Sequence, residues 1–288
     1  MTTSEIIKQV RRVEIKTKRL SNHIFSGEYH SSFKGKGMSF SEVRRYEMGD
    51  DVRDIDWNVT AKLHEPYVKV FEEERELTMM LLVDVSASST FGTLKSEKRQ
   101  LMTELCAVLA FSAIQNNDKV GLILFSSEVE KFIPPKKGKS HILRIIRELI
   151  EFEPKSKDTN ISVALKFMMQ VIKKQCITFL VSDFIDEDYQ TEIQMASRKY
   201  DFTGVRIFDR HEEQMPDVGL IECVDVETNE SILIDSSSKK VRTAYDAKFH
   251  VHKGYCADVF RKSGSDLIEL QTDENYIKKL LAFFKKRS

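Results

Sequence analysis

From residue 77 onward, short apolar runs alternate with longer amphipathic stretches. The runs are short enough to be buried strands, and the stretches between them have the period of helices. The predicted strands are Met79–Val83, Val120–Phe125, Ile177–Val181 and Val205–Phe208. The predicted helices are Ser96–Gln115, Ser140–Ile150, Ile161–Lys174 and Tyr189–Lys199. Because strands that alternate with helices are joined by right-handed crossovers, the pattern predicts an α/β fold with a doubly wound, mostly parallel sheet.

The two ends of the chain add a few elements to this core. Ser231–Asp235 and Leu267–Gln271 are predicted to be strands, and Glu274–Lys286 a closing helix. Residues 1–24 have apolar positions at helical spacing and a basic outer face, which predicts an amphipathic helix docked on its own domain. We therefore divide the chain into an N-terminal helix and loop (1–36), a short strand-rich segment packed on the core (37–76), and the α/β domain (77–288).

Composition and charge narrow the class of protein. The 288 residues carry 45 Lys and Arg against 45 Asp and Glu, so no net field recruits nucleic acid. No apolar run approaches the roughly 18 residues that span a bilayer, and the N-terminus lacks the apolar core of a signal peptide. The 4 cysteines are scattered, and we expect buried, reduced thiols. A cytoplasmic protein without a transmembrane segment is expected.

Candidate chemistry begins where the first predicted strand of the α/β domain ends, in an Asp-x-Ser-x-Ser loop. Asp84, Ser86 and Ser88 place oxygen ligands at alternate positions, and hard divalent cations such as Mg²⁺ prefer oxygen ligands. In a doubly wound sheet, ligands bind outside the carboxyl ends of the strands. Asp183 follows the strand Ile177–Val181 and reaches that same edge. Thr159, before the helix Ile161–Lys174, joins them if its loop crosses the edge.

Each of these residues also has a structural interpretation. Ser86 and Ser88 could satisfy the first turn of a helix, and Asp158 or Thr159 could cap the helix that follows them. Asp183 precedes the acidic residues Asp186, Glu187 and Asp188, where a solvated loop is the simpler interpretation. We favour the metal site for the Asp84 loop and for Asp183, whereas Thr159 is evenly balanced.

Other motifs argue against nucleotide binding and catalysis. Gly138-Lys139-Ser140 matches the end of a phosphate loop, but Ile133 stands where that loop needs Gly, so we expect a solvated basic loop. His250 and His252 lie on different faces if their segment is helical, which keeps them from sharing an ion. No Ser-His-Asp or Cys-His set stands out.

Together, the Asp84 loop, Thr159 and Asp183 resemble the metal-ion-dependent adhesion site of von Willebrand factor A domains. The resemblance implies that Asp84, Ser86, Ser88, Thr159 and Asp183 hold Mg²⁺, or Mn²⁺ or Ca²⁺, partly through water. It also implies that the ion keeps a position open for a carboxylate from a binding partner. Two positions depart from that family, where Gly often replaces Asp158 and Phe184.

The segment before the α/β domain carries a second and more specific resemblance. Its Gly-Met-Ser-Phe-Ser-Glu-Val-Arg-Arg-Tyr run and its Gly-Asp-Asp-Val-Arg-Asp-Ile-Asp-Trp run, residues 37–46 and 49–57, are similar to a bacterial family called domain of unknown function fifty-eight. Leu270-Gln271-Thr272-Asp273 is similar as well. The resemblance implies a von Willebrand factor A-like domain that works with AAA+ ATPases of the MoxR class, as an adaptor in chaperone-like assembly or metal insertion.

Two functional hypotheses follow. The first is a non-catalytic protein-binding adaptor, whose cation completes its coordination with an Asp or Glu of a protein partner such as a MoxR-class ATPase. The alternative is a metal-dependent phosphatase or hydrolase with Asp84 as nucleophile. Trp57 is expected to anchor the upstream segment on the sheet. The charged residues around Trp57 form either an ion-pair network or a binding rim, and both interpretations stay open; they are Arg44, Arg45, Asp50, Asp51, Arg53, Asp54 and Asp56.

Overall fold

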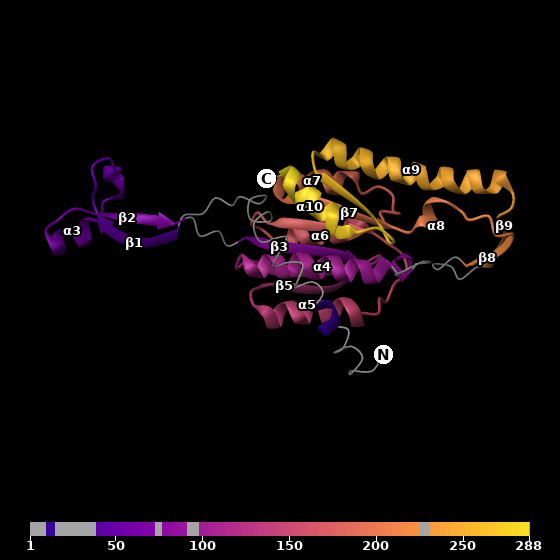
Figure 1. The fold of residues 1–288 in the computed structure, drawn as a ribbon, viewed down its shortest axis with the longest axis horizontal. Coiled ribbons are helices and arrows are strands. Elements are labelled where there is room, and N and C mark those ends of the chain that lie inside the picture. The colour runs from indigo at the N-terminus through magenta and orange to yellow at the C-terminus, as the bar shows by residue number, and fades with distance from the viewer. Residues whose placement is uncertain (1–9, 15–38, 73–76, 91–97, 225–230, 288) are drawn as a thin grey trace. The chain divides into compact units, whose positions relative to one another are not determined.

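The computed structural model describes residues 10–14, 39–72, 77–90, 98–224 and 231–287 (Figure 1). The chain divides into two compact units. The larger unit comprises residues 1–33 and 77–288, and the smaller one comprises residues 34–76. The larger unit contains the main sheet and the candidate chemistry, so it is described first.

A six-stranded sheet with the order β10-β7-β6-β3-β4-β5 forms the centre of the larger unit. Neighbouring strands are parallel except β4 and β5, which are antiparallel. The strands are β3 (Thr78–Asp84), β4 (Lys119–Phe125), β5 (Val129–Lys136), β6 (Ile177–Ser182), β7 (Asp201–Phe208) and β10 (Asp266–Gln271). The chain runs from β3 to β4 on one side and later to β6 on the other. The strand order therefore reverses at β3, where such sheets bind their ligands.

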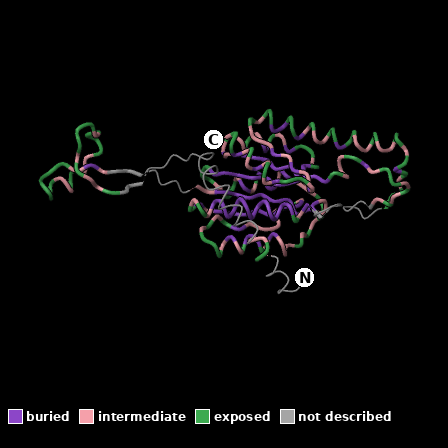
Figure 2. The backbone as a smooth tube through the Cα atoms, in the orientation of Figure 1, coloured by how far each residue is buried: buried purple, intermediate pink, exposed green. Residues whose placement is uncertain are grey.

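Helices cover both faces of this sheet (Figure 1). They are α4 (Lys98–Gln115), α5 (Lys139–Glu151), α6 (Ile161–Val171), α7 (Gln190–Lys199), α9 (Lys239–Ser263) and α10 (Tyr276–Arg287), and the short helix α8 (Arg210–Glu213) follows β7. Side chains of a strand point alternately to its two faces. Met79, Leu81 and Val83 accordingly join the apolar cluster under α4, α5 and α10. Met80 and Leu82 join the cluster under α6, α7 and α9. Figure 2 shows the buried residues concentrated in these central strands and in α4.

The observed topology confirms the predicted doubly wound, mostly parallel α/β fold. Two of the predicted segments differ in their structural role. The segment expected to be a solvated basic loop instead ends strand β5 and begins helix α5, and Lys139 pairs with Glu14 at 2.6 Å. The strand β9 (Ser231–Asp235) lies outside the main sheet, because it pairs antiparallel with β8 (Leu220–Val224).

The smaller unit is built around an antiparallel pair, β1 (Ser39–Arg45) and β2 (Tyr67–Glu72), with the helix α3 (Trp57–Leu63) between them in sequence. Its charged residues form contacts inside the unit. Arg44 binds Asp50 through two bonds of 2.8 and 2.6 Å, and Asp56 caps α3. These contacts favour the ion-pair network over a free binding rim. Trp57 begins α3 and is 67% exposed, and the expected packing of this unit on the sheet stays a prediction.

Only part of the predicted N-terminal helix falls within the described residues. Residues 10–14 are helical, and Val10 and Val13 pack against the apolar cluster that includes α5. The remainder of that helix and the predicted loop up to residue 36 lie outside the described residues. Among the helices that the structure describes, none is both long and apolar enough to cross a membrane.

The cysteines lead to a testable difference in reactivity. Cys106, Cys176 and Cys256 are buried, as predicted, whereas Cys223 in β8 is half-buried. Burial raises the pKa of the Cys106 and Cys256 thiols to about 12 and that of Cys176 to about 11. Because the thiolate is the reactive form, we expect iodoacetamide at pH 8 to modify Cys223 first in the native protein. Mass spectrometry of the digested protein measures this order, and Cys106 reacting as fast as Cys223 would contradict it.

Candidate functional site

The candidate site lies at the carboxyl edge of the sheet, where β3 and β6 end side by side. In the register of these two strands, Val83 pairs with Val181, so Asp84 and Ser182 extend from neighbouring positions. Asp183 is the next residue after β6. Residues that are 99 positions apart in sequence therefore meet because the strand order reverses at β3.

The Asp84 carboxylate is buried and both of its oxygens accept hydrogen bonds. Oδ1 accepts from the Ser86 backbone N–H at 2.9 Å, and Oδ2 accepts from the Ser182 hydroxyl at 2.7 Å. Burial, together with the nearby charge of Asp183, raises the pKa of Asp84 to about 6. The site thus holds more negative charge than its burial favours, and a bound cation would relieve that excess.

Two serine hydroxyls connect the Asp84 loop to Asp183. The Oγ atoms of Ser86 and Ser88 lie 3.1 Å apart, and the Ser88 hydroxyl contributes to lowering the pKa of the Asp183 carboxyl. The loop keeps this shape because the Ser89 hydroxyl donates to the Ser86 carbonyl at 2.7 Å, inside a short 3-10 turn at Ala87–Thr90. Four of the five residues predicted from the sequence therefore gather at one edge of the sheet.

The fifth residue, Thr159, is placed at the edge by its neighbours. The Ala87 N–H donates to the Lys157 carbonyl at 3.0 Å, and the Asn160 N–H donates to the Ser126 carbonyl at 2.9 Å. These bonds hold the Thr159 loop against the loops that follow β3 and β4. The structural alternative, in which Asp158 or Thr159 caps α6, is wrong, because Asn160 is the N-cap and accepts from the Val163 N–H at 3.0 Å.

A buried lysine forms the main ion pair of Asp183. The Nζ atom of Lys98, at the start of α4, lies 2.9 Å from Asp183 Oδ2 and 2.7 Å from Glu212 Oε1, and the Lys98 side chain is fully buried. Burial opposes ionisation of Asp183, but the Lys98 ammonium outweighs it and lowers the pKa of that carboxyl. Burial raises the pKa of Glu212, which Lys98 only partly offsets.

Glu212 continues this network along the edge of the sheet. Its Oε2 accepts from the Asp209 backbone N–H at 2.8 Å, as part of a capping box at the start of α8. Asp209 in turn accepts from the Thr272 hydroxyl at 2.7 Å, just beyond β10. Sequence reasoning missed Lys98, Glu212 and Ser182. Thr272 belongs to a motif that it had identified without a role.

The donor set at this edge fits a hard divalent cation. Hydroxyl and carboxylate oxygens are the ligands that Mg²⁺, Mn²⁺ and Ca²⁺ accept, and the raised pKa of Asp84 marks unbalanced negative charge. The fit depends on the serine hydroxyls. Among the described residues, no group of three or more His, Cys, Asp and Glu side chains has the arrangement of a metal site.

The geometry is unfavourable for Asp84 as a nucleophile. Its side chain is 1% exposed, and both oxygens are already engaged by Ser86 and Ser182. A nucleophilic carboxylate must reach an electrophilic centre of the substrate. The arrangement at Asp84 thus favours a role in organising the loop over a direct attack on a phosphoester.

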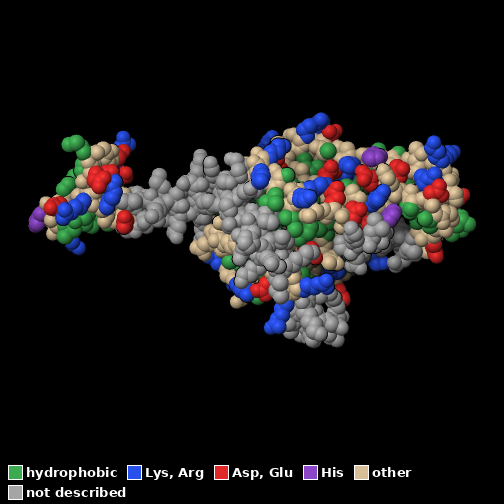
Figure 3. Space-filling model, viewed as in Figure 1, with side chains coloured by type: hydrophobic (Ala, Val, Ile, Leu, Met, Phe, Trp, Pro, Cys, Tyr) green, Lys and Arg blue, Asp and Glu red, His purple; other side chains and the backbone are tan. Residues whose placement is uncertain are grey.

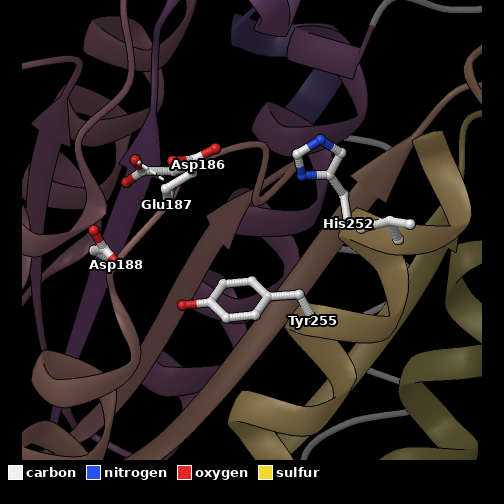
Figure 4. Close-up of a pocket in the computed structure, with 6 residues that line it drawn as sticks. Asp186, Glu187, Asp188, His252 and Tyr255 are labelled. Atoms are coloured by element: carbon white, nitrogen blue, oxygen red, sulfur yellow. Dashed lines mark hydrogen bonds between the residues drawn. The ribbon is translucent and has the colours of Figure 1, made fainter.

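A separate pocket of about 300 Å³ lies between the loop after β6 and α9 (Figure 4). It is lined by Asp186, Glu187, Asp188, Val251, His252 and Tyr255. Asp186 has a structural role there, since its Oδ2 accepts from the Ile161 N–H at 2.8 Å. The pocket lining includes none of the residues predicted to hold the cation.

A protein-family model described as "Protein of unknown function DUF58" matches residues 42–255. The uncharacterized protein Rv1480 of Mycobacterium tuberculosis is 25% identical over 281 residues, which cover 96% of this chain and 88% of the relative. The solved structure of BatB from Bacteroides thetaiotaomicron superposes with a TM-score of 0.51 and 13% identity, covering 73% of this chain and 98% of BatB. The VWA domain of SpRpn10 superposes less closely, with a TM-score of 0.41 and 10% identity over 74% of this chain and 96% of that domain.

Proposed function

This chain belongs to the DUF58 family, and from that premise we propose that it is a non-catalytic protein-binding adaptor with a divalent-cation site. The proposed ligand set is Asp84, Ser86, Ser88, Thr159 and Asp183, and the proposed ion is Mg²⁺, with Mn²⁺ or Ca²⁺ as substitutes. The observation that carries the proposal is that the paired Ser86 and Ser88 hydroxyls and the buried Asp84 and Asp183 carboxylates gather at the point where the strand order reverses.

The proposed binding mode is a shared metal contact. In the von Willebrand factor A domains that this chain resembles, the ion accepts a carboxylate from the partner. Ser88 and Thr159 are half-buried, unlike Asp84, Ser86 and Asp183, and are therefore the ligands that lie nearer to solvent. A partner Asp or Glu would bind reversibly there, which suits an adaptor that must release its client.

The proposed partner is a MoxR-class AAA+ ATPase in the cytoplasm. Its support is the resemblance of residues 37–57 and of the motif around Thr272 to the family associated with such ATPases. The surface adds no competing preference for nucleic acid. On the face of the larger unit that Figure 3 shows, Lys and Arg side chains are interspersed with Asp and Glu side chains, in line with the equal totals of 45 in the sequence.

A capture assay with purified proteins tests this function. The immobilised chain is mixed with a MoxR-class ATPase from the same organism, in buffer with either Mg²⁺ or EDTA. We expect capture in Mg²⁺, loss of capture in EDTA, and loss in the variant Ser86→Ala/Ser88→Ala. Ser127→Ala is the matched control, because the Ser127 hydroxyl at the same edge bonds to Ser156 instead. Capture that is insensitive to both EDTA and the double substitution would refute the cation-dependent adaptor.

A further inference from the structure

Lys98 is a buried cation that helix stability does not explain. It begins α4, and the positive end of the helix dipole lies there, so a lysine in the first turn is electrostatically unfavourable. Its side chain is nevertheless fully buried and bonded to two carboxylates, Asp183 and Glu212. Burying three charged groups is costly unless they balance one another. The burial of Lys98 is therefore explained by the two carboxylates that it contacts.

The first partner, Asp183, connects Lys98 to the proposed cation site. Asp183 Oδ2 accepts from the Lys98 ammonium at 2.9 Å, and the charge of the same carboxylate acts on Asp84 at the end of the neighbouring strand. The other buried cation near Asp183 among the described residues is Arg206. Its guanidinium donates to the Asp183 backbone carbonyl and pairs with Glu269 at 3.2 Å, so it does not contact the Asp183 carboxylate. Lys98 is thus the positive charge that contacts this candidate ligand.

We propose that Lys98 is an internal counter-cation of the site, holding the Asp183 carboxylate in place when no divalent ion is bound and limiting how tightly an ion binds. The inference rests on the proposed cation site. Lys98 then influences the affinity for the ion although it lies outside the Asp-x-Ser-x-Ser loop. A charge a few ångströms away changes the proton affinity of a carboxylate by roughly one to three powers of ten. A divalent ion carries twice the charge of a proton, so the effect of Lys98 on it is at least as large.

The test is a titration of the full chain with Mn²⁺, followed by electron paramagnetic resonance of the free ion. We expect Lys98→Met to bind Mn²⁺ about ten-fold more tightly than the wild type, or better. Lys98→Arg keeps the charge and is expected to bind like the wild type. Lys253→Met is the matched control. It removes a lysine that pairs with Glu213, the residue after Glu212, at 3.2 Å.

A second variant covers the case in which Lys98→Met does not fold without metal. Lys98→Met removes the lysine that contacts the carboxylates of Asp183 and Glu212. Lys98→Met/Glu212→Gln also removes one of these two negative charges. Gln can replace Glu in the capping box of α8, so that helix start is preserved. This variant is also expected to bind Mn²⁺ more tightly than the wild type, and Mn²⁺ should raise its melting temperature more than that of the wild type.

The outcomes separate the inference from the function on which it rests. Tighter Mn²⁺ binding by Lys98→Met or by Lys98→Met/Glu212→Gln than by the wild type supports the inference. This holds even if the wild type binds no Mn²⁺, and in that case only the proposed occupancy of the site in the wild type is refuted. Equal affinities in the wild type and both Lys98→Met variants overturn the role of Lys98 and leave the cation site standing. Absence of Mn²⁺ binding in every protein overturns both.

Discussion

Asp84→Asn is expected to be more stable than the wild type in metal-free buffer at pH 8, by about 3 kcal/mol. Burial and the charge of Asp183 raise the pKa of Asp84 from 3.8 to about 6, so keeping it ionised costs folding free energy. The asparagine keeps an acceptor for the Ser86 N–H without that charge. A residue whose removal stabilises the fold is one that the protein retains for function.

The stability difference between Asp84→Asn and the wild type is expected to depend on pH in one direction. Between pH 3.8 and about 6, the folded protein holds a proton on Asp84 that the unfolded chain releases. Stability contributed by this group is therefore highest below the unfolded pKa and falls as pH rises toward 6. Urea unfolding with EDTA should show the advantage of Asp84→Asn shrinking to about half at pH 5. An advantage that is absent at pH 8, or that grows on acidification, would contradict it.

Asp183→Asn is expected to have the opposite effect, a loss of about 3 kcal/mol at pH 8. Both aspartates are buried at the same edge, but Asp183 lies 2.9 Å from the Lys98 ammonium, which lowers the pKa of Asp183 despite burial. Neutralising Asp183 removes the charge of one of the two carboxylates that the structure places 2.9 and 2.7 Å from the buried Lys98 ammonium. The stability that Asp183 contributes is present above its unfolded pKa and is lost as pH falls through its lower folded pKa.

The same urea unfolding experiment measures this loss. Asp201→Asn is the control, because Asp201 pairs with Arg287 at 2.7 Å where both side chains are partly exposed. Partly exposed pairs contribute about 1 kcal/mol or less, so the control should differ little from the wild type. If Asp84→Asn and Asp183→Asn shifted stability in the same direction, the charge distribution described here would be wrong.

The strands of the core were predictable because their signal is local. Met79–Val83 is a continuous apolar run and Ile177–Val181 is apolar except for Thr178, and they form β3 and β6 with only one added residue at each of three ends. The edge strand β5 was missed, since Pro134 and Pro135 interrupt its pattern. Proline is tolerated there because an edge strand can leave one side unpaired.

The candidate site was predictable only as far as its residues follow strands directly. Asp84 and Asp183 could be placed at one edge because parallel strands end together. Lys98 could not, since it stands in the charged run Lys95-Ser96-Glu97-Lys98-Arg99, which is typical of an exposed helix start. Its burial depends on Asp183 and Glu212, which are 85 and 114 residues away. No local pattern contains that information.

The central claim is a cation site built by the Asp84 loop and Asp183, and Mn²⁺ titration of the wild type and Asp84→Asn tests it most directly. Asp118→Asn is the control, because Asp118 is equally buried but binds the Leu77 N–H at the other end of β3. We expect saturable binding of one ion per chain in the wild type and in Asp118→Asn, and none in Asp84→Asn. Equal binding by the wild type and Asp84→Asn, or no binding by the wild type, would contradict the site.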